Sequence, residues 1–330
     1  MFLSFRRDYP FTYTLCTSIL LIILLGLSYA GLFGPPGKEG EREEFLVTPE
    51  ETLEEVSHAL AARGLIGNTF GFSIAYAIRH GSVELTPGGY EVAPNMDAWT
   101  VATILSEPPR LAWVRVPDGY RKEQTADLFA RTLGWTEEEK ERWIMEDTVV
   151  GEEVKEGVYF PDIYLIPSDQ STIEVAERMR ARFGHMTKDL NAEAIEKGIN
   201  WNEALVIASL VQREADGAHD MPLIAGIIWN RLEIDMPLGI DATLQYIRGE
   251  PGKWWPVPQS DDKYLESPYN TYFRPGLPPY PIANPSLEAI AAVLNPEETE
   301  CYYYLHDYDG DIHCASSYNA HRANVDRYLK

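Results

Sequence analysis

The longest apolar run in the chain lies close to its beginning. Residues 11–33 carry no charged side chain, and a helix of about 20 apolar residues is long enough to cross the hydrocarbon core of a bilayer. Arg6 and Arg7 precede the run and an acidic segment follows it, so we expect residues 1–10 in the cytoplasm and the rest of the chain outside. A cleaved signal peptide is the alternative, because Ser28-Tyr-Ala30 resembles a cleavage site. The run continues to Phe33, which favours an uncleaved transmembrane anchor.

After this run the chain changes to short helical and strand-like segments. Residues 34–44 are polar and rich in glycine and proline, which predicts a linker. Residues 45–117 mix the two hydrophobic periodicities, which predicts a small α+β module. Its expected elements are a helix over 48–63 with Thr48 as N-cap and Gly64 as stop, helices over 69–80 and from Asp97, a hairpin or bent strand over 83–92, and a strand over 111–116.

The remaining residues, 118–330, predict a larger and mostly helical domain. Its expected elements are two short acidic helices over 121–150, an extended segment over 157–167, helical stretches over 168–198, 202–214, 221–232 and 285–294, a hairpin over 301–315 and a last helix from Tyr318. We therefore predict the α+β fold class, with an N-terminal transmembrane helix, a small α+β module and a mixed α+β domain.

The helix predicted over 202–214 is the best specified element. Asn200 is expected to cap its start, with Glu203 completing a capping box. An apolar stripe at helical spacing follows, and it consists of Leu205, Ile207, Ala208, Leu210 and Val211.

One acidic residue, Glu214, belongs to this apolar stripe, since it lies three positions after Val211. Loss of hydration penalises a charged carboxylate, so the pKa of Glu214 should rise. A carboxylic acid that keeps its proton near neutral pH suits general acid catalysis of glycosidic bond cleavage. The alternatives are that Glu214 turns toward water at the helix end, or pairs with Arg213 or Arg231.

Charge and cysteine content narrow the class of protein. The formal net charge of −23 argues against nucleic acid as a partner and disfavours docking on an anionic membrane surface. Of the three cysteines, Cys16 lies in the apolar run, whereas Cys301 and Cys314 flank the predicted hairpin and either form a disulfide or stay free. No cysteine or histidine cluster has metal-ligand spacing, so we expect no metal and no cofactor.

Several blocks in the second half of the chain occur in an order and spacing that resemble one family. They are Gln212 to Ala215, Ala225 to Leu232, Met236 to Tyr246, Pro268 to Tyr272, Gly276 to Pro285, and Asn295-Pro296. Together they are similar to the endolytic murein transglycosylase family (MltG, or YceG-like, proteins), over about residues 40–330.

The resemblance implies a protein of the bacterial inner membrane with its catalytic domain outside. Such proteins cut peptidoglycan glycan strands internally, between N-acetylmuramic acid and N-acetylglucosamine, and leave a 1,6-anhydro end. The single glutamate that does this falls on Glu214. The implied partners are glycan strands, the bilayer through residues 11–33, and the peptidoglycan synthases.

The segment Leu85-Thr-Pro-Gly-Gly-Tyr90, in its helical and strand-like surroundings, resembles a LysM-like module, a type that binds glycan chains. Residues 45–117 are therefore expected to form a LysM-like module, and residues 118–330 the catalytic domain. The alternative for the module is a small packing domain without a ligand.

The resemblance also implies substrate-binding residues around Glu214. Their aromatic faces, amides and hydroxyls suit sugar rings and N-acetyl groups, although each could simply shape a loop. The set is Asn230, Asp241, Thr243, Tyr246, Tyr269, Asn270, Thr271, Tyr272, Leu277, Pro278, Asn284 and His313.

Three positions depart from the family pattern. Gln212 stands where the family usually has glutamate, Ala215 where it has threonine, and Ala315 where it has an aromatic residue. These changes leave open a non-catalytic wall-binding or scaffold protein. A muramidase that uses water in place of the sugar C6 hydroxyl is a third reading.

Overall fold

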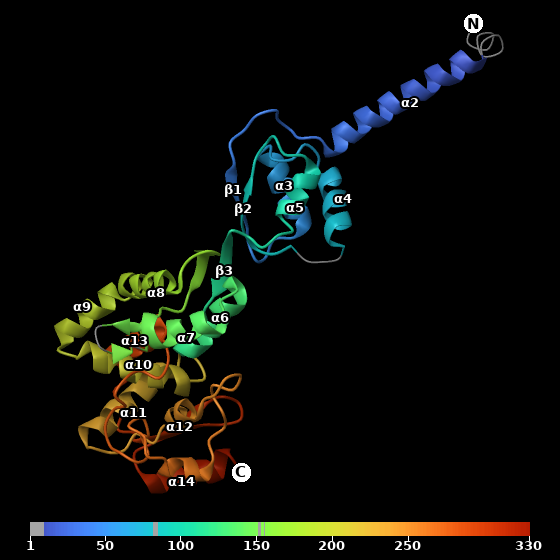
Figure 1. The fold of residues 1–330 in the computed structure, drawn as a ribbon. Helices are drawn as coiled ribbons and strands as arrows, with labels where there is room; N and C mark the ends of the chain where they lie inside the picture. Colours follow the sequence, from blue (N-terminus) through green and yellow to red (C-terminus); the bar gives the residue numbers. More distant parts are fainter. Residues whose placement is uncertain (1–9, 82–84, 151–152, 155) are drawn as a thin grey trace. The chain divides into compact units, whose positions relative to one another are not determined.

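The computed structural model describes residues 10–81, 85–150, 153–154 and 156–330. The predicted cytoplasmic residues 1–9 lie outside that part. The chain separates into two compact units, Met1–Trp113 with Leu165–Asp169, and Val114–Tyr164 with Gln170–Lys330. The domain boundaries expected from the sequence remain predictions, and each unit is described by itself (Figure 1).

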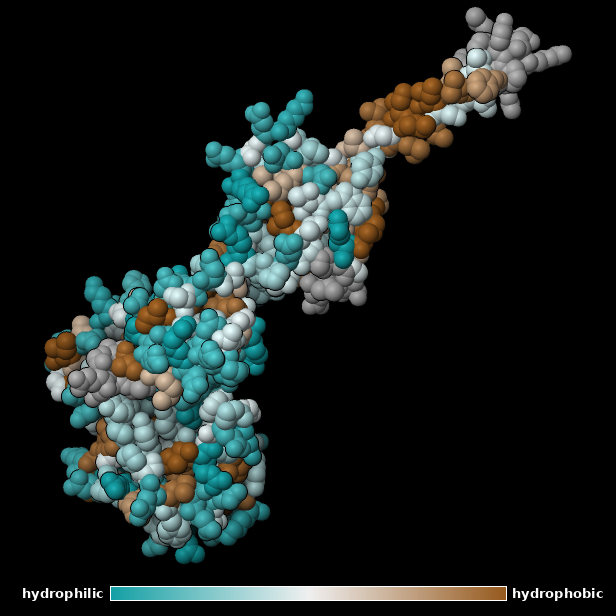
Figure 2. All heavy atoms as spheres, viewed as in Figure 1, coloured by the Kyte–Doolittle hydropathy of each residue, from teal (hydrophilic) through white to brown (hydrophobic). Residues whose placement is uncertain are grey.

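The predicted membrane segment forms one helix, α2 (Pro10–Phe33). The segment Phe11–Phe33 is long and apolar enough to cross a membrane, and its most apolar part is not buried within the protein. Figure 2 shows brown, apolar side chains over the visible face of α2. The C-terminal end of α2 contacts α4 and α5, where Phe33 stacks on Trp99, and the apolar side chains before it are exposed. Such an exposed apolar helix suits a lipid environment, although a signal sequence has the same character.

The first unit combines a small antiparallel sheet with three helices. Strand β1 (Glu43–Val47) pairs with β2 (Gly88–Val92), which pairs with β3 (Leu111–Arg115), and β6 (Ile163–Pro167) completes the order β1-β2-β3-β6. Helices α3 (Leu53–Ala62), α4 (Thr69–His80) and α5 (Ala98–Ile104) contribute to its core. The largest fully buried side chains of that core are Phe45, Leu60, Leu65, Phe72, Tyr90 and Leu105.

Two local expectations for this unit were wrong. Strand β1 begins at Glu43, inside the predicted linker 34–44, because Phe45 and Val47 are buried and the whole segment pairs with β2. Helix α3 is capped by Thr52 and not by Thr48, since the Thr52 side chain and Glu55 form a capping box. The segment predicted as a hairpin or bent strand over 83–92 contributes only β2, and residues 82–84 lie outside the described part.

The second unit is mostly helical, as expected. Its helices are α6 (Lys122–Leu133), α7 (Glu137–Arg142), a π-helical turn (Trp143–Asp147), α8 (Thr172–Met186), α9 (Lys188–Lys197), α10 (Trp201–Glu214), α11 (Met221–Glu233), α12 (Asp241–Arg248), a 3-10 turn (Ser260–Tyr264), α13 (Leu287–Leu294) and α14 (Tyr318–Tyr328). The short strands β4 (Val149–Val150) and β5 (Glu153–Val154) pair with each other, as do β7 (Tyr303–His306) and β8 (Ile312–Ala315).

Helix α10 lies at the centre of this unit's core. Every residue from Ala204 to Val211 is buried, so the helix needs packing partners on all sides. Helices α11 and α13 supply them, and their buried residues join the same cluster (Figure 1). At Gly226 of α11 an added Cβ would lie 2.3 Å from the carbonyl oxygen of Glu297, so only glycine permits this close approach.

The hairpin β7–β8 is tied both to itself and to α11. Cys301 and Cys314 form a disulfide with their Cα atoms 5.8 Å apart. The Asn230 side chain donates to the carbonyl oxygens of Thr299, at 2.7 Å, and Cys301, at 3.1 Å. The Arg231 Nε donates to the carbonyl oxygen of Tyr302 at 2.6 Å. The hairpin is therefore held at its base by one covalent bond and three hydrogen bonds.

We predict that replacing Cys301 and Cys314 together by alanine lowers the free energy of unfolding. The disulfide closes a loop with a sequence separation of 13, and a loop of this size contributes about 3 kcal/mol by restricting the unfolded chain. Thermal unfolding of the full-length protein in detergent, with and without reductant, measures the effect. Cys16→Ser is the control and should leave the melting temperature unchanged. Equal melting of the double variant and the wild type would contradict the prediction.

Candidate functional site

Glu214 occupies the last position of α10. The Asn200 side chain accepts the backbone N–H groups of Asn202 at 2.9 Å and Glu203 at 3.2 Å, so the start of the helix is capped as predicted. The other half of the expected capping box, in which the Glu203 side chain would accept the backbone N–H of Asn200, does not form between these two described residues. Ala215 turns the backbone to an extended conformation, which ends the helix directly after the acid.

The Glu214 carboxyl faces a small pocket. The pocket has a volume of about 260 Å³. Its lining residues are Glu214, Arg231, Leu238, Gly239, Asp241, Tyr272, Tyr303, Tyr304 and His321. The Tyr304 hydroxyl donates to Glu214 Oε2 at 2.6 Å. Neither Arg213 nor Arg231 forms an ion pair with Glu214, so the predicted alternatives of pairing with these arginines do not hold.

Burial raises the pKa of Glu214, as the sequence predicted, and the charge of Asp241 raises it further. The hydrogen bond from Tyr304, the backbone N–H of Ala242 and the charge of His306 lower that pKa, but they do not outweigh burial. Burial and the neighbouring Glu214 charge raise the pKa of the Tyr304 hydroxyl well above its ordinary value, so this group keeps its proton and remains a donor. The site thus holds a carboxyl group that keeps its proton to a higher pH than an exposed glutamate does.

Two of the predicted substrate-binding residues line this pocket. Asp241, at the start of α12, accepts a hydrogen bond from the Tyr272 hydroxyl at 2.6 Å. The Lys263 ammonium lies 4.7 Å from the centre of the Tyr272 ring. Asp241 and Tyr272 therefore form one wall beside Glu214, with a second carboxylate within the pocket.

Three other predicted residues support that wall from behind. Thr243 and Thr271 are buried, and their hydroxyl oxygens lie 3.0 Å apart. The backbone N–H of Ile240 donates to Thr271 Oγ1 at 2.9 Å. Asn270 is 1% exposed and its amide donates to three backbone carbonyls of the preceding turn. These side chains fix the shape of two loops and do not line the pocket.

Asn284 is also committed to the scaffold. Its carbonyl oxygen accepts the backbone N–H of Tyr159 at 2.9 Å, and its amide donates to the Tyr120 carbonyl at 2.9 Å and to Glu156 Oε1 at 3.0 Å. Glu156 is 4% exposed and also accepts the backbone N–H of Lys122. This buried network joins segments that are more than a hundred residues apart in the sequence.

Tyr246 and Tyr269 lie outside the pocket and pack on each other with ring centres 4.9 Å apart. The Arg121 guanidinium lies over the Tyr246 ring at 4.1 Å, and the Arg213 guanidinium lies over Trp255 at 4.0 Å. This layer of rings and cations borders α10 on another side.

Four further predicted residues do not reach the pocket. Leu277 packs on the core and Pro278 is buried. Asn230 holds the base of the hairpin, as described above. His313 binds Asp307 at 2.7 Å and stacks on Tyr328 at 3.6 Å, so the structure places it against α14.

The pocket also contains residues that the sequence did not single out. Tyr303 and Tyr304 come from β7, His321 comes from α14, and Arg231 had been considered only as an ion-pair partner. The His321 ring stacks on Tyr303, and its Nδ1 is buried without a partner among the described residues. The sequence signal that could have pointed to Tyr303 and Tyr304 is the run of three tyrosines at 302–304 that follows Cys301.

The three residues that depart from the family pattern lie outside the pocket of Glu214. Gln212 Oε1 accepts the backbone N–H of Ser286 at 2.9 Å, so it holds the loop before α13 and faces away from Glu214. Ala215 packs on the core, and Ala315 is buried opposite Tyr303 in the hairpin.

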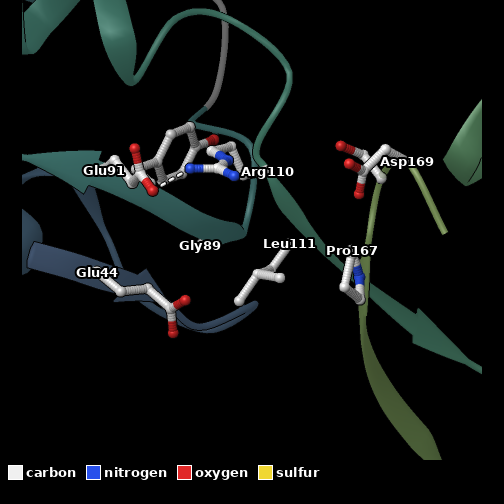
Figure 3. Close-up of a pocket in the computed structure, with 9 residues that line it drawn as sticks. Glu44, Gly89, Glu91, Arg110, Leu111, Pro167 and Asp169 are labelled. Carbon is white, nitrogen blue, oxygen red and sulfur yellow. Dashed lines mark hydrogen bonds and ion pairs between the residues drawn. The ribbon is translucent and has the colours of Figure 1, made fainter.

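Two other pockets lie elsewhere. One, of about 440 Å³, is lined by Glu156, Trp201, Asn202, Tyr280 and their neighbours at the opposite end of α10. The other lies in the first unit and has about 410 Å³. Figure 3 shows Arg110 paired with Glu91 there, with Glu44 on β1 and Asp169 just after the end of β6. Neither pocket contains a residue predicted to bind substrate.

The sequence profile of the YceG-like family matches residues 45–327. The chain belongs to the YceG-like family. A solved structure of a YceG-like protein from Listeria monocytogenes has the same fold, with a TM-score of 0.60 at 22% identity over 87% of this chain and 100% of that chain. A mixed α+β fold is thereby confirmed.

Two curated relatives of this YceG-like chain are named endolytic murein transglycosylase. One, from Streptococcus pneumoniae serotype 2 strain D39, is 27% identical over 94% of this chain. The other, from Bacillus subtilis strain 168, is 29% identical over 53% of this chain. The aligned region spans 64% of the pneumococcal relative and 48% of the Bacillus relative.

No group of three or more histidine, cysteine, aspartate or glutamate side chains that could hold a metal ion is found in the described part of the chain. The expectation of a site without metal or cofactor remains a prediction.

We predict that Glu156 makes the protein less stable as the pH rises. Burial, followed by the charge of Glu123, raises the pKa of Glu156 to about 7, whereas the Lys122 N–H and the charges of Arg121 and Lys122 lower it. A glutamate in an unfolded chain has a pKa of about 4.3. Between about pH 4.3 and pH 7 the folded protein therefore holds a proton on Glu156 that the unfolded chain has lost. This stabilisation is lost as the pH rises through about 7.

Chemical denaturation of the wild type and of Glu156→Gln at pH 5 and pH 8 tests this. The variant should lose part of the decrease in unfolding free energy between the two pH values. Glu203→Gln removes an exposed carboxylate and should retain the wild-type decrease. A Glu156→Gln variant with an unaltered decrease would show that Glu156 does not titrate in this range.

Proposed function

We propose that this chain is a membrane-anchored lytic transglycosylase that cuts the bond between N-acetylmuramic acid and N-acetylglucosamine within peptidoglycan strands. The cut leaves 1,6-anhydro-N-acetylmuramic acid ends and stops the elongation of nascent strands. Family membership supports the proposal, and so do the relatives named endolytic murein transglycosylase. The observation that carries it is the Glu214 carboxyl, whose pKa is raised by burial in an open pocket.

The chemistry requires one group that acts first as acid and then as base. Protonated Glu214 donates its proton to the glycosidic oxygen as the bond from that oxygen to C1 of the muramic acid breaks. The C6 hydroxyl of the same sugar then attacks C1, and the Glu214 carboxylate takes the hydroxyl proton. The nucleophile belongs to the substrate, so little entropy is lost in bringing it to C1. Glu214 ends the cycle protonated, ready for the next strand.

A hydrolase is the second candidate, because Asp241 lies in the same pocket. Hydrolytic glycosidases use two carboxyl groups, one as acid and one as nucleophile or base. The Asp241 carboxylate already accepts a hydrogen bond from Tyr272, which suits a group that orients the pocket and holds negative charge near Glu214.

The reading of this chain as a non-catalytic scaffold protein gains less support. It was based on the family residues missing at positions 212, 215 and 315. In this chain Gln212 binds the loop before α13, Ala215 packs on the core and Ala315 lies in the hairpin. None of the three lines the pocket of Glu214.

The wider proposal places α2 in the inner membrane with the N-terminus in the cytoplasm and both units outside. The disulfide fits an oxidising compartment. The first unit acts as a LysM-like module that holds glycan, and peptidoglycan synthases supply the strand. The apolar helix and the distribution of charge around it support the anchor.

We predict that Glu214→Gln abolishes strand cleavage while the protein still folds. The amide keeps the shape of the side chain but has no acidic proton to donate, and general acid catalysis contributes at least about a hundred-fold to such rates. Full-length protein in detergent is incubated with uncrosslinked glycan strands, and the products are identified by mass spectrometry. Glu203→Gln, in the exposed first turn of the same helix, is the matched control and should cut normally. Cleavage retained in Glu214→Gln would remove this residue from the mechanism.

We predict that Asp241→Asn still yields 1,6-anhydro ends. Its charge raises the pKa of Glu214, so its removal lowers that pKa, and activity should decline at a lower pH than in the wild type. Asp235→Asn, at an exposed position outside the pocket, is the control. Reducing ends from the wild type, together with loss of all cleavage in Asp241→Asn, would establish the hydrolase instead.

A further inference from the structure

Tyr304 is the described side chain that hydrogen-bonds the Glu214 carboxyl, at 2.6 Å. The contact joins residues that are 90 positions apart. The tyrosine belongs to β7 and the glutamate to α10, so local helix geometry does not bring them together. Other contacts must therefore hold Tyr304 beside Glu214.

The hairpin β7–β8 supplies that hold. Tyr304 pairs with Cys314 across the two strands, and Cys314 is bonded to Cys301 just before β7. On α11, Asn230 donates to the carbonyl oxygens of Thr299 and Cys301, and Arg231 donates to that of Tyr302. Farther along β7, His306 Nε2 lies 3.0 Å from Asp220 Oδ2, and Asp220 is buried just before α11. Tyr304 is thus fixed between two anchored points on one strand.

We infer that Tyr304 is a positioning residue that assigns the two oxygens of Glu214 different tasks. The hydroxyl occupies Oε2 as a donor, so Oε2 serves as the carbonyl-type oxygen of the protonated acid, and the proton is carried on Oε1. The carbonyl oxygen of a carboxylic acid is its better acceptor, and the other oxygen then carries the O–H donor. Among the described side chains, Tyr304 is the donor to this carboxyl, and it occupies Oε2. The backbone N–H of Ala242 is a further donor to the carboxyl. In this assignment Oε1 presents the proton to the substrate.

The catalytic part of this inference rests on the proposed function. The hydrogen bond from Tyr304 also predicts an effect on the pKa of Glu214 that does not depend on that function. In the carboxylate form the Tyr304 hydroxyl stabilises the negative charge, so it lowers the pKa of Glu214. Without the hydroxyl the acid should hold its proton to a higher pH. A general acid loses activity as the pH rises through its pKa, so the alkaline limb of the pH–rate profile should move upward.

The test is Tyr304→Phe, which removes one oxygen and keeps the ring. We expect the maximal rate of strand cleavage to fall by about ten-fold or more, because the acid is less well aligned. The alkaline limb of the profile should shift to higher pH. The matched control is Tyr308→Phe at the exposed turn of the same hairpin, whose hydroxyl bonds the Leu329 carbonyl and not the pocket. It should leave both the rate and the profile unchanged.

A second readout does not depend on activity. Glutamate labelled with ¹³C in the side-chain carboxyl is titrated by NMR in the full-length protein, and the Glu214→Gln spectrum identifies the Glu214 signal. In Tyr304→Phe the Glu214 titration should move to higher pH than in the wild type. An unchanged titration overturns the inference, even if the rate falls, because a purely structural role would lower the rate without moving the pKa.

The two proposals can fail separately. If the wild type cuts no strand and the Glu214 titration still shifts in Tyr304→Phe, the proposed function is wrong and the positioning of Glu214 by Tyr304 stands. If the wild type produces 1,6-anhydro ends and neither the profile nor the titration shifts, the function stands and the inference is wrong.

Discussion

The burial of α10 is the constraint on which the second unit depends. The middle of the helix is buried on all sides and mostly apolar, so it is stable only when other elements surround it, and α11 and α13 contribute to this packing. The same packing carries the end of α10 to a place where Glu214 loses much of its hydration. The largest cause of the raised pKa of the acid is therefore how the core closes, and the charge of Asp241 adds to it.

Most residues of the family motifs act on backbone geometry. Asn270, Thr271 and Asn284 are buried, and their polar groups form hydrogen bonds with backbone carbonyls and N–H groups of loops. A buried amide that lost these partners would leave several groups unpaired, at a cost of about 1–3 kcal/mol each. Asn270 and Thr271 bind the backbone N–H groups of Tyr272 and Ile240, so they help to fix where Tyr272 and Asp241 stand beside the acid.

The sequence predicted much of this structure because its signals were local. The spacing of Ile207, Leu210 and Val211 placed Glu214 on a buried face, and the cap at Asn200 was read correctly. The sequence did not reveal Tyr304, because periodicity says which face of an element is buried but not which distant segment covers it. It also missed β1, since a short alternation at Phe45 and Val47 becomes a strand only when β2 lies beside it.

A single residue that works as acid and then as base needs a balanced pKa. Burial and the charge of Asp241 favour the protonated form of Glu214, whereas Tyr304, the Ala242 N–H and His306 favour the carboxylate. The first pair alone would raise the pKa of Glu214 further, and the second group alone would lower it. Asp241 and Ala242, which act in opposite directions, belong to α12, whereas Tyr304 and His306 belong to the anchored hairpin. The proposed reaction therefore depends on both of these elements.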